Sequence, residues 1–415
     1  MKNWSGNIEY GTESIEYPKT VEELQQVVRN STKITALGSQ HSFNKIADSS
    51  TKQVSLKEMN KVISLDKIAH TVTVEAGMRY GELAPFLHQH GYALHNLASL
   101  PHITIAGSCA TATHGSGLHN GNLATSIAAI EFVNAAGDLI QLSGKDGDTF
   151  KGAVVGLGAL GIVTKLTLNL LPAFNMRQYV YENMPLEALE KNFVAIMGMG
   201  YSVSLFTDWR NKNINQVWMK MIDDKDNKAA PDLLFGATLA KTDLHPVTGQ
   251  SAENCTAQMG VAAPWFESLP HFKMGFKPSA GAELQSEYFI PISHAYEAIM
   301  AMEKLNEQIS PYLFTSEIRT IKADELWMSP CYKNTCVALH TTWHLEEAMV
   351  MLLLPIIEKQ LAPFKAQPHW GKVYTMDAES INANIERLAD FKRLAAHYDP
   401  EGKFRNAFLD KIFNG

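Results

Sequence analysis

Apolar and polar positions alternate along much of the first 170 residues, a pattern that predicts short strands with one buried face. Thr71–Gly77 ("TVTVEAG") and Gly161–Pro172 ("GIVTKLTLNLLP") alternate with period two, and Ser126–Ser143 reads as two strands joined by the turn "AAGD". The segment "KITALG" also reads as a strand. Pro18–Ser31 and "GELAPFLHQHG" instead space their aliphatic residues at helical intervals. An α+β layout is therefore expected here.

The pattern changes after Pro172. Strand-like segments ("YSVSLFTDW", "NQVWMKMI", "VALHTTWH") occur together with helical ones ("HAYEAIMAMEKLNEQI", "HLEEAMVMLLLPIIEKQL"). The polar stretch Lys241–Ala257 lies between the first two strand-like segments and the rest. This arrangement predicts a second sheet backed by helices. The mixed charges of Asp223–Lys228 ("DDKDNK") predict a solvated turn at a hairpin end.

The length of 415 residues predicts two domains, because a single core stops growing below this size. The formal net charge is −7, so there is no basic excess for binding nucleic acid or an anionic membrane. A neutral or anionic small molecule remains a possible ligand.

Cysteine usage and apolar runs suggest a reduced, cytoplasmic protein. Four scattered cysteines form no disulfide framework and no zinc-type pair, so buried or reduced thiols are expected. The N-terminal residues lack an apolar signal region, and the longest apolar run, Ala348–Ile357, is too short to cross a bilayer.

Two glycine-rich segments, Gly38–Ser42 ("GSQHS") and Ala106–Gly117 ("AGSCATATHGSG"), are predicted as loops. Neither matches the P-loop or the G-x-G-x-x-G pattern. Their small residues nevertheless leave backbone N–H groups and hydroxyls open to a pyrophosphate, although each segment could simply form a tight turn. The first segment contains His41, which is either an ordinary hydrogen-bonded residue or a nucleophile toward an electrophilic cofactor carbon.

Charged and polar residues recur with period two in "SEIRT" and "ALHTTWH". Glu317 and Arg319 share one strand face, as do His340, Thr342 and His344. A surface salt bridge is one explanation. A polar face in an otherwise apolar segment instead favours a pocket for a polyhydroxylated ligand.

Several longer segments resemble a known family. They are "ALGSQHSFN", "LASLPHITIAGSCATATHGSG", "LHPVTGQSAENCT", "PWFESLPHFKMGFKPSAGAELQSEY", "EIRTI", "HTTW", "PHWGK" and "DPEGKFRNAFL". In this order they resemble the alditol (xylitol) oxidases of the vanillyl-alcohol-oxidase flavoprotein family, from Ala36 to Leu409. The resemblance implies an α+β fold in which residues 1–173 and 374–415 form a split FAD-binding domain of two α/β subdomains. Residues 174–373 would form an inserted cap domain of antiparallel sheet backed by helices.

The resemblance also implies site residues. It implies that FAD is attached covalently to His41, with no metal, and that Ala98 leaves room for dioxygen beside the flavin. The implied cofactor contacts are Ala36, Leu37, Gly38, Ser39, Gln40, His41, Ser42, Ser99, Thr104, Gly107, Thr111, Ala112, Thr113, His114 and Ile162. The implied substrate contacts are Ser99, Gln285, Glu317, Arg319, His340, Thr342 and Lys372, of which Lys372, Arg319 and Glu317 are catalytic. Gln40 departs from the arginine expected before the histidine.

The implied activity is oxidation of the terminal hydroxyl of xylitol or sorbitol to the aldose, with hydride transfer to FAD and reduction of O₂ to H₂O₂. Lys372 and Arg319 would stabilise the alkoxide, and either Lys372 or His340 would accept the proton. The expected protein is a monomer. A sugar-1,4-lactone oxidase or dehydrogenase of the same fold and a non-catalytic carbohydrate-binding protein are the alternatives.

Overall fold

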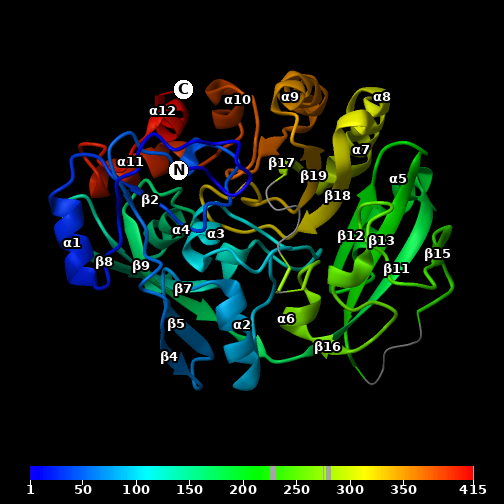
Figure 1. The fold of residues 1–415 in the computed structure, drawn as a ribbon, viewed down its shortest axis with the longest axis horizontal. Coiled ribbons are helices and arrows are strands. Elements are labelled where there is room, and N and C mark those ends of the chain that lie inside the picture. The colour runs from blue at the N-terminus through cyan, green and yellow to red at the C-terminus, as the bar shows by residue number, and fades with distance from the viewer. Residues whose placement is uncertain (225–229, 274, 277–281, 415) are drawn as a thin grey trace.

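The structure is a computed structural model that describes residues 1–224, 230–273, 275–276 and 282–414. Most of the turn predicted at 223–228 lies outside the described residues. Two large sheets dominate the fold (Figure 1), one in the N-terminal part and one in the middle of the chain.

The N-terminal part contains three sheets. A three-stranded parallel sheet has the order β1-β3-β2, a five-stranded antiparallel sheet has the order β4-β5-β9-β7-β8, and β6 pairs with β10. The strands are β1 (Ile15–Glu16), β2 (Thr35–Ala36), β3 (Gln53–Val54), β4 (Val62–Asp66), β5 (Thr71–Glu75), β6 (Tyr92–Ala93), β7 (Ile127–Val133), β8 (Leu139–Ser143), β9 (Ile162–Asn169) and β10 (Leu171–Pro172). The strands predicted from alternation are therefore confirmed, and "KITALG" contributes the two residues of β2.

Four helices accompany these strands: α1 (Val21–Arg29), α2 (Tyr80–Gln89), α3 (Ile105–Ala110) and α4 (Asp148–Val154). The side chain of Thr20 caps α1 by accepting a hydrogen bond from the amide of Glu23. Helix α3 corrects one expectation, because the second glycine-rich segment was predicted to be a loop throughout. Its residues "IAGSCA" include no proline, and Ile105 and Cys109 bury their side chains in the core.

The middle of the chain forms a larger antiparallel sheet, here called the cap sheet, with the order β14-β15-β11-β13-β12-β18-β19-β17-β20 and with β16 paired to β11. Its strands are β11 (Asn175–Pro185), β12 (Ser202–Thr207), β13 (Asn213–Ile222), β14 (Leu233–Leu234), β15 (Ala237–Leu239), β16 (Ala263–Pro264), β17 (Glu283–Pro291), β18 (Leu313–Ile321), β19 (Cys336–His344) and β20 (Gln367–Pro368). The second sheet predicted from the sequence is thus confirmed.

The two faces of the cap sheet differ in polarity. Helices α5 (Leu189–Met197), α7 (Ala295–Glu303) and α9 (Glu347–Leu361) cover one face, along the upper and right margins of Figure 1. On this face Leu205, Ile318 and Leu339 pack in one core with helix residues. The short helices α6 (Trp265–Ser268) and α8 (Asn306–Ile309) complete this part. The opposite face carries polar residues and faces the N-terminal part.

The C-terminal segment returns to the N-terminal part as α10 (Ala378–Asn382), α11 (Leu388–Tyr398) and α12 (Ala407–Asn414), near the N-terminus in Figure 1. The Lys403 ammonium donates to the carbonyl oxygens of Val28 and Ala135 at 2.9 and 2.8 Å. The Ile34 amide donates to the carbonyl oxygen of Lys403 at 3.0 Å, so this segment anchors β2 just before the first glycine-rich loop.

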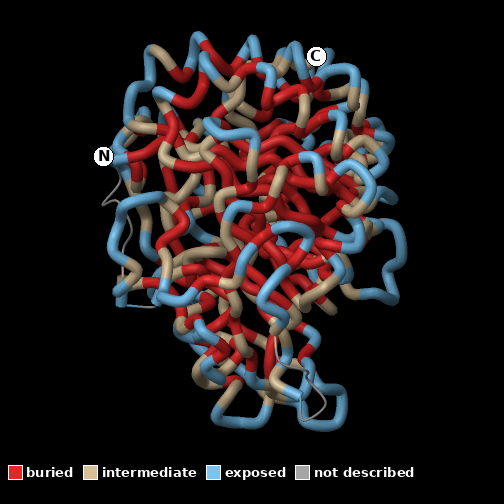
Figure 2. The backbone as a smooth tube through the Cα atoms, turned by 90° about the vertical axis from the view of Figure 1, so that its right-hand side faces the viewer, coloured by how far each residue is buried: buried red, intermediate tan, exposed pale blue. Residues whose placement is uncertain are grey.

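Buried residues fill the interior of the molecule in Figure 2, and exposed ones follow its rim. All four cysteines are buried and free, as predicted. In the part of the chain that the structure describes, no helix has both the length and the hydropathy to cross a bilayer.

Candidate active site

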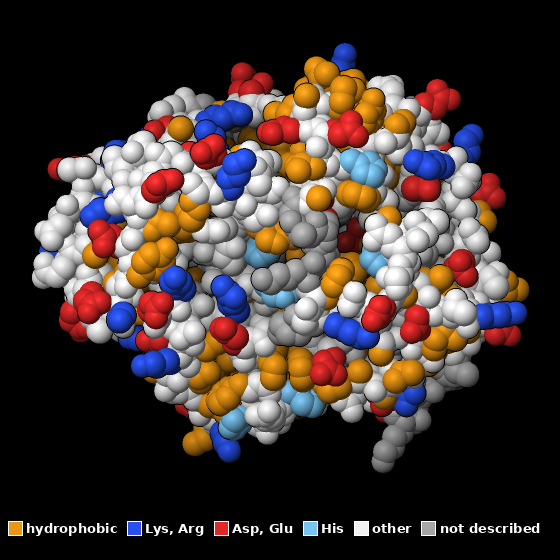
Figure 3. All heavy atoms as spheres, viewed as in Figure 1, with side chains coloured by type: hydrophobic (Ala, Val, Ile, Leu, Met, Phe, Trp, Pro, Cys, Tyr) orange, Lys and Arg blue, Asp and Glu red, His pale blue; other side chains and the backbone are white. Residues whose placement is uncertain are grey.

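A cavity of about 800 Å³ lies between the N-terminal loops and the polar face of the cap sheet. It brings together the two glycine-rich segments, the Glu317–Arg319 pair and Lys372. Of the predicted site residues, Ala112 alone does not line it, because its side chain is buried in the hydrophobic core. Basic and acidic side chains are interspersed over the face shown in Figure 3, without an extended basic patch.

The first glycine-rich loop is anchored at both ends. The Leu37 amide donates to the carbonyl oxygen of Val54, and the Phe43 amide donates to that of Gly371, both at 2.8 Å. Between these anchors, the amides of Gly38, Ser39, Gln40 and Ser42 donate to no protein acceptor among the described residues. Consecutive unpaired N–H groups around a cavity are suited to binding an anion such as a pyrophosphate.

The two loops approach each other closely at Thr104. Its amide donates to Ser39 Oγ at 3.3 Å. A Cβ atom added at Gly38 or at Gly107 would lie 2.9 or 2.8 Å from Thr104 Oγ1. A side chain at Gly38 would therefore force the first loop or Thr104 to move, whereas one at Gly107 would crowd the N-cap residue of its own helix, α3.

His41 lines the cavity beside a residue that the sequence analysis did not single out. Its ring centroid lies 5.2 Å from that of Trp4, with the rings tilted by 40°. The Trp4 amide donates to the carbonyl oxygen of Gln40 at 2.9 Å. The N-terminal residues thus fix both the backbone and the ring environment of His41.

Strand register explains why the polar residues cluster. In the cap sheet His340 pairs with Glu317 of β18 on one side and with Glu287 of β17 on the other. Thr342 likewise pairs with Gln285. Because side chains of paired residues point to the same face, these residues converge on the cavity.

Arg319 lies between two carboxylates. Its Nη2 atom donates to Glu287 Oε1 at 3.2 Å, and its Nε atom lies 3.5 Å from Glu317 Oε1. His271 contributes a second contact to Glu317, from Nε2 to Oε1 at 2.7 Å. All four side chains are buried.

These contacts keep both carboxylates ionised. Burial alone would raise the pKa of Glu317, but the charge of Arg319 and the contact with His271 lower it well below its usual value. The pKa of Glu287 is also lowered, because His114 and Arg319 outweigh its burial. The site therefore presents a buried cation between two fixed anions.

Lys372 and His340 meet at the side-chain amide of Gln285. The Lys372 ammonium and His340 Nε2 both contact Gln285 Oε1, the latter at 3.2 Å, and Gln285 Nε2 donates to Glu283 Oε1 at 2.5 Å. Burial lowers the pKa of Lys372 to about 8, with nearby Glu287 opposing the shift. Burial lowers the pKa of His340 to about 3, so this ring is neutral at physiological pH.

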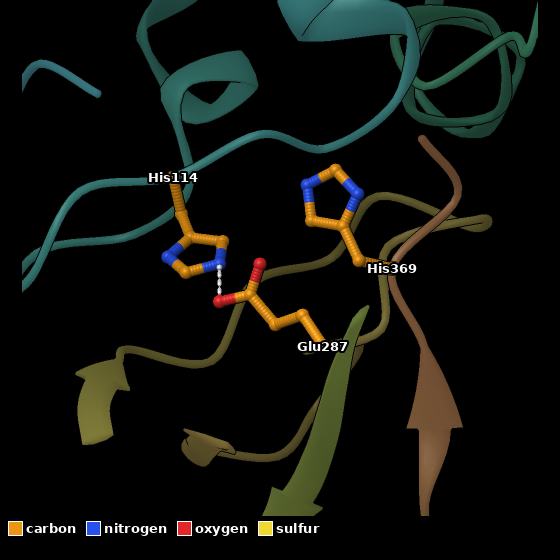
Figure 4. Close-up of side chains that lie close together, drawn as sticks. All are labelled: His114, Glu287 and His369. Atoms are coloured by element: carbon orange, nitrogen blue, oxygen red, sulfur yellow. Dashed lines mark ion pairs between the residues drawn. The ribbon is translucent and has the colours of Figure 1, made fainter. Parts of the chain in front are cut away.

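His114, Glu287 and His369 also converge (Figure 4), with ligand atoms within 4.8 Å of one another. The lone pair of His369 Nδ1 already accepts the Gly371 amide at 3.0 Å, which leaves the ring proton on Nε2 in the neutral form. Glu287 Oε1 is shared between Arg319 and His114 Nε2 at 3.2 and 3.1 Å. The Arg319 guanidinium already occupies Glu287, and His369 has no free lone pair for a metal ion, so these residues favour an ion-pair cluster over a metal site.

Sequence reasoning missed Glu287 and His271 as site residues. Glu287 follows Gln285 by two positions, so strand alternation already placed it on the same face. His271 lies in a segment without periodicity, and only the folded chain brings it to Glu317.

The chain is similar in sequence to several known proteins. Residues 13–143 match the family described as FAD binding domain, and residues 278–412 match the family described as D-arabinono-1,4-lactone oxidase. An alditol oxidase from a Streptomyces species is 45% identical over 418 residues, covering 100% of this chain and 99% of the relative. An L-gulono-1,4-lactone dehydrogenase from Mycobacterium tuberculosis is 24% identical over 431 residues, covering 99% of this chain and 98% of the relative.

Solved structures support the fold. A cholesterol oxidase from B. sterolicum superposes with a TM-score of 0.78 at 14% identity, covering 99% of this chain and 96% of that chain. A carbohydrate oxidase from Microdochium nivale superposes with a TM-score of 0.76 at 16% identity, covering 97% and 92%. Full-length similarity to an alditol oxidase, together with a matching FAD-binding segment, confirms the predicted family: the chain belongs to the alditol oxidases, within the vanillyl-alcohol-oxidase type of FAD-binding flavoproteins.

Proposed function

We propose that this protein oxidises the terminal primary hydroxyl of sugar alcohols such as xylitol and sorbitol to the aldose, using FAD, and reduces O₂ to H₂O₂. The single cavity shared by the glycine-rich loops and the Glu317–Arg319–Lys372 cluster carries this proposal. The 45% identity to an alditol oxidase along the whole chain supports the substrate class.

The residues present fit FAD. The unpaired amides of the first loop, next to Thr104, suit a pyrophosphate. The same cavity extends from these amides to the cap sheet, so the rest of the FAD molecule would lie along it. The contact residues would be those that the sequence implied, apart from the side chain of Ala112. When bound, FAD supplies a hydride acceptor and passes the electrons to O₂.

Arg319 would hold the reacting oxygen of the polyol. Its pKa is raised, with Glu317 and Glu287 outweighing burial, so it supplies a fixed positive charge to an oxygen that gains negative charge. Glu317 would orient the guanidinium and accept a hydrogen bond from a neighbouring hydroxyl. Ser99, Gln285, His340 and Thr342 would bind the remaining hydroxyls.

Lys372 is the better of the two candidates for the proton acceptor. A general base works best when its pKa lies near the working pH. The pKa of Lys372 is about 8, whereas that of His340 is about 3 and those of Glu317 and Glu287 lie well below their usual values. The neutral amine of Lys372 would therefore take the hydroxyl proton, while Gln285 holds its nitrogen in place.

Covalent attachment of FAD to His41 is also part of the proposal. The ring lines the cavity in an anchored loop and lies next to Trp4, an arrangement that suits a tethered aromatic cofactor.

The division into residues 1–173, 174–373 and 374–415 is proposed as the domain organisation, because the C-terminal helices pack beside the N-terminal sheets. A monomeric, cytoplasmic protein remains the expectation from the sequence.

A sugar-1,4-lactone oxidase is the second candidate, because residues 278–412 match the D-arabinono-1,4-lactone oxidase family. The purified protein should be yellow and should form H₂O₂ with xylitol or sorbitol. Peroxide formed faster from gulono- or galactono-1,4-lactone than from either polyol would favour the second candidate. A colourless protein without peroxide formation would indicate a carbohydrate-binding protein and contradict both.

A further inference from the structure

We propose that Lys220 and His271 are positioning residues for the polyol site, acting together to fix the carboxylate of Glu317. Neither residue was among the site residues that the sequence implied. The inference rests on the proposed function, because it concerns how the polyol is held.

The three side chains form a continuous buried chain of contacts. Lys220 Nζ donates to the carbonyl oxygens of Leu269 and Pro270, both at 2.8 Å, and contacts His271 Nδ1 at 3.3 Å. His271 Nε2 contacts Glu317 Oε1 at 2.7 Å. The exposed fractions of Lys220, His271 and Glu317 are 1%, 6% and 4%, so water does not replace these contacts.

The protonation pattern follows from the number of donors. An ammonium group has three hydrogens and no acceptor, and Lys220 has three acceptors around it. Burial lowers the pKa of Lys220 to about 7, with the charge of Glu317 opposing the shift, so this side chain is an ammonium below that pH. His271 Nδ1 then offers its lone pair to Lys220, which places the ring proton on Nε2. The imidazole thus donates to Glu317, and Lys220 determines the tautomer that permits it.

Two aromatic side chains hold the imidazole in this orientation. The ring of His271 lies edge-on to Phe206 and Trp218, at centroid distances of 5.5 and 5.3 Å. In the strand register Phe206 pairs with both Gln216 of β13 and Glu317 of β18. Lys220, Trp218, Phe206 and Glu317 therefore share the cavity-facing side of the cap sheet.

The chain of contacts continues to the substrate end. Glu317 faces Arg319 at 3.5 Å, and both residues line the cavity. A carboxylate held by His271 on one side can keep the guanidinium at a fixed distance on the other. Without the His271 donor, Glu317 is free to rotate, and Arg319 loses one of its two anionic partners.

The inference predicts weaker polyol binding when the chain of contacts is broken. In Lys220→Met and His271→Leu the KM for xylitol should rise at least tenfold. The kcat per bound FAD should change less than threefold, because Lys372 is untouched and Arg319 keeps its ion pair with Glu287. His271→Gln should restore KM to within threefold of wild type, since its amide can donate to Glu317 and accept from Lys220. Lys403→Met is the matched control, because this lysine also donates to two backbone carbonyls but lies outside the cavity lining.

Misfolding alone would not produce this result, because a smaller active fraction lowers kcat and leaves KM unchanged. An unaltered KM in Lys220→Met, or His271→Gln as impaired as His271→Leu, would overturn the inference.

A second measurement does not depend on turnover. The ¹⁵N NMR spectrum of histidine-labelled protein at pH 6 should show His271, assigned by its loss in His271→Gln, as the neutral Nε2–H tautomer, and this pattern should change in Lys220→Met. If wild type fails to oxidise polyols but shows this tautomer, the proposed function is wrong and the contact chain still exists. If wild type oxidises polyols but His271 carries its proton on Nδ1, the inference fails while the function holds.

Discussion

Arg319 Nη1 donates a hydrogen bond to Ser99 Oγ at 3.4 Å, between residues that are 220 positions apart in the chain. Ser99 belongs to the loop before α3, and Arg319 belongs to β18 of the cap sheet. The contact therefore joins the N-terminal wall of the cavity to its cap-sheet wall, since both residues line it.

The first prediction concerns this contact. Ser99→Ala should raise the KM for xylitol by about tenfold, since hydrogen bonds to charged groups are typically worth about 1.5–3 kcal/mol. The FAD content should change little, because Ser99 is one of many implied cofactor contacts and the amides of the first glycine-rich loop are untouched. Steady-state kinetics normalised to bound flavin measures this effect. A KM equal to that of wild type would show that the contact does not matter for substrate binding.

Replacement of Lys372 tests the proposed proton acceptor. In Lys372→Met the rate of flavin reduction by xylitol should fall about a hundredfold or more, the range expected for loss of general base catalysis. The protein should stay yellow, because Lys372 meets the polyol side of the cavity. Stopped-flow reduction under anaerobic conditions gives the rate. Lys333→Met, which removes an exposed lysine paired with Glu386, serves as control and should reduce its flavin at the wild-type rate.

The pH dependence of the same rate gives an independent test. Burial lowers the pKa of Lys372 to about 8, and only the neutral amine accepts a proton. The flavin reduction rate should therefore rise as the pH increases through about 8 and then level off. This rise should be absent in Lys372→Met. A wild-type rate that decreases above this pH would mean that Lys372 acts through its positive charge.

Alternation and helical spacing predicted strands such as β5, β9 and β19 and helices such as α1 and α9, because these segments have one clearly apolar face. The long cap strands β11 and β17 were not predicted. The same rule placed Glu317 with Arg319, and His340 with Thr342, but it did not tell which strands are neighbours. The contact between Glu317 and His271 depends on a loop that crosses the face of the sheet, and no local pattern encodes it. Helix α3 was missed because small residues are compatible with a loop or a helix, and burial of Ile105 decides between them.

The close approach of the two glycine-rich segments leads to a prediction about cofactor content. In Gly38→Ala the new Cβ would lie 2.9 Å from Thr104 Oγ1, so the loop must shift and its amides lose their alignment. We expect the flavin-to-protein absorbance ratio of the purified variant to fall to less than half. Gly144→Ala is a suitable control, because a Cβ at this position meets no atom within 4 Å. An equal flavin content in both variants would contradict the assigned role of the first loop.

The proposed link between His41 and FAD can be tested without turnover. Acid precipitation of the wild-type protein should leave the yellow colour in the pellet, because a covalent bond survives unfolding. In His41→Ala the flavin should move to the supernatant, since only noncovalent contacts with the loop amides remain. His397→Ala removes an exposed histidine of α11 and should behave like wild type. A wild-type pellet that loses its flavin on precipitation would show that FAD is bound without a covalent bond to His41.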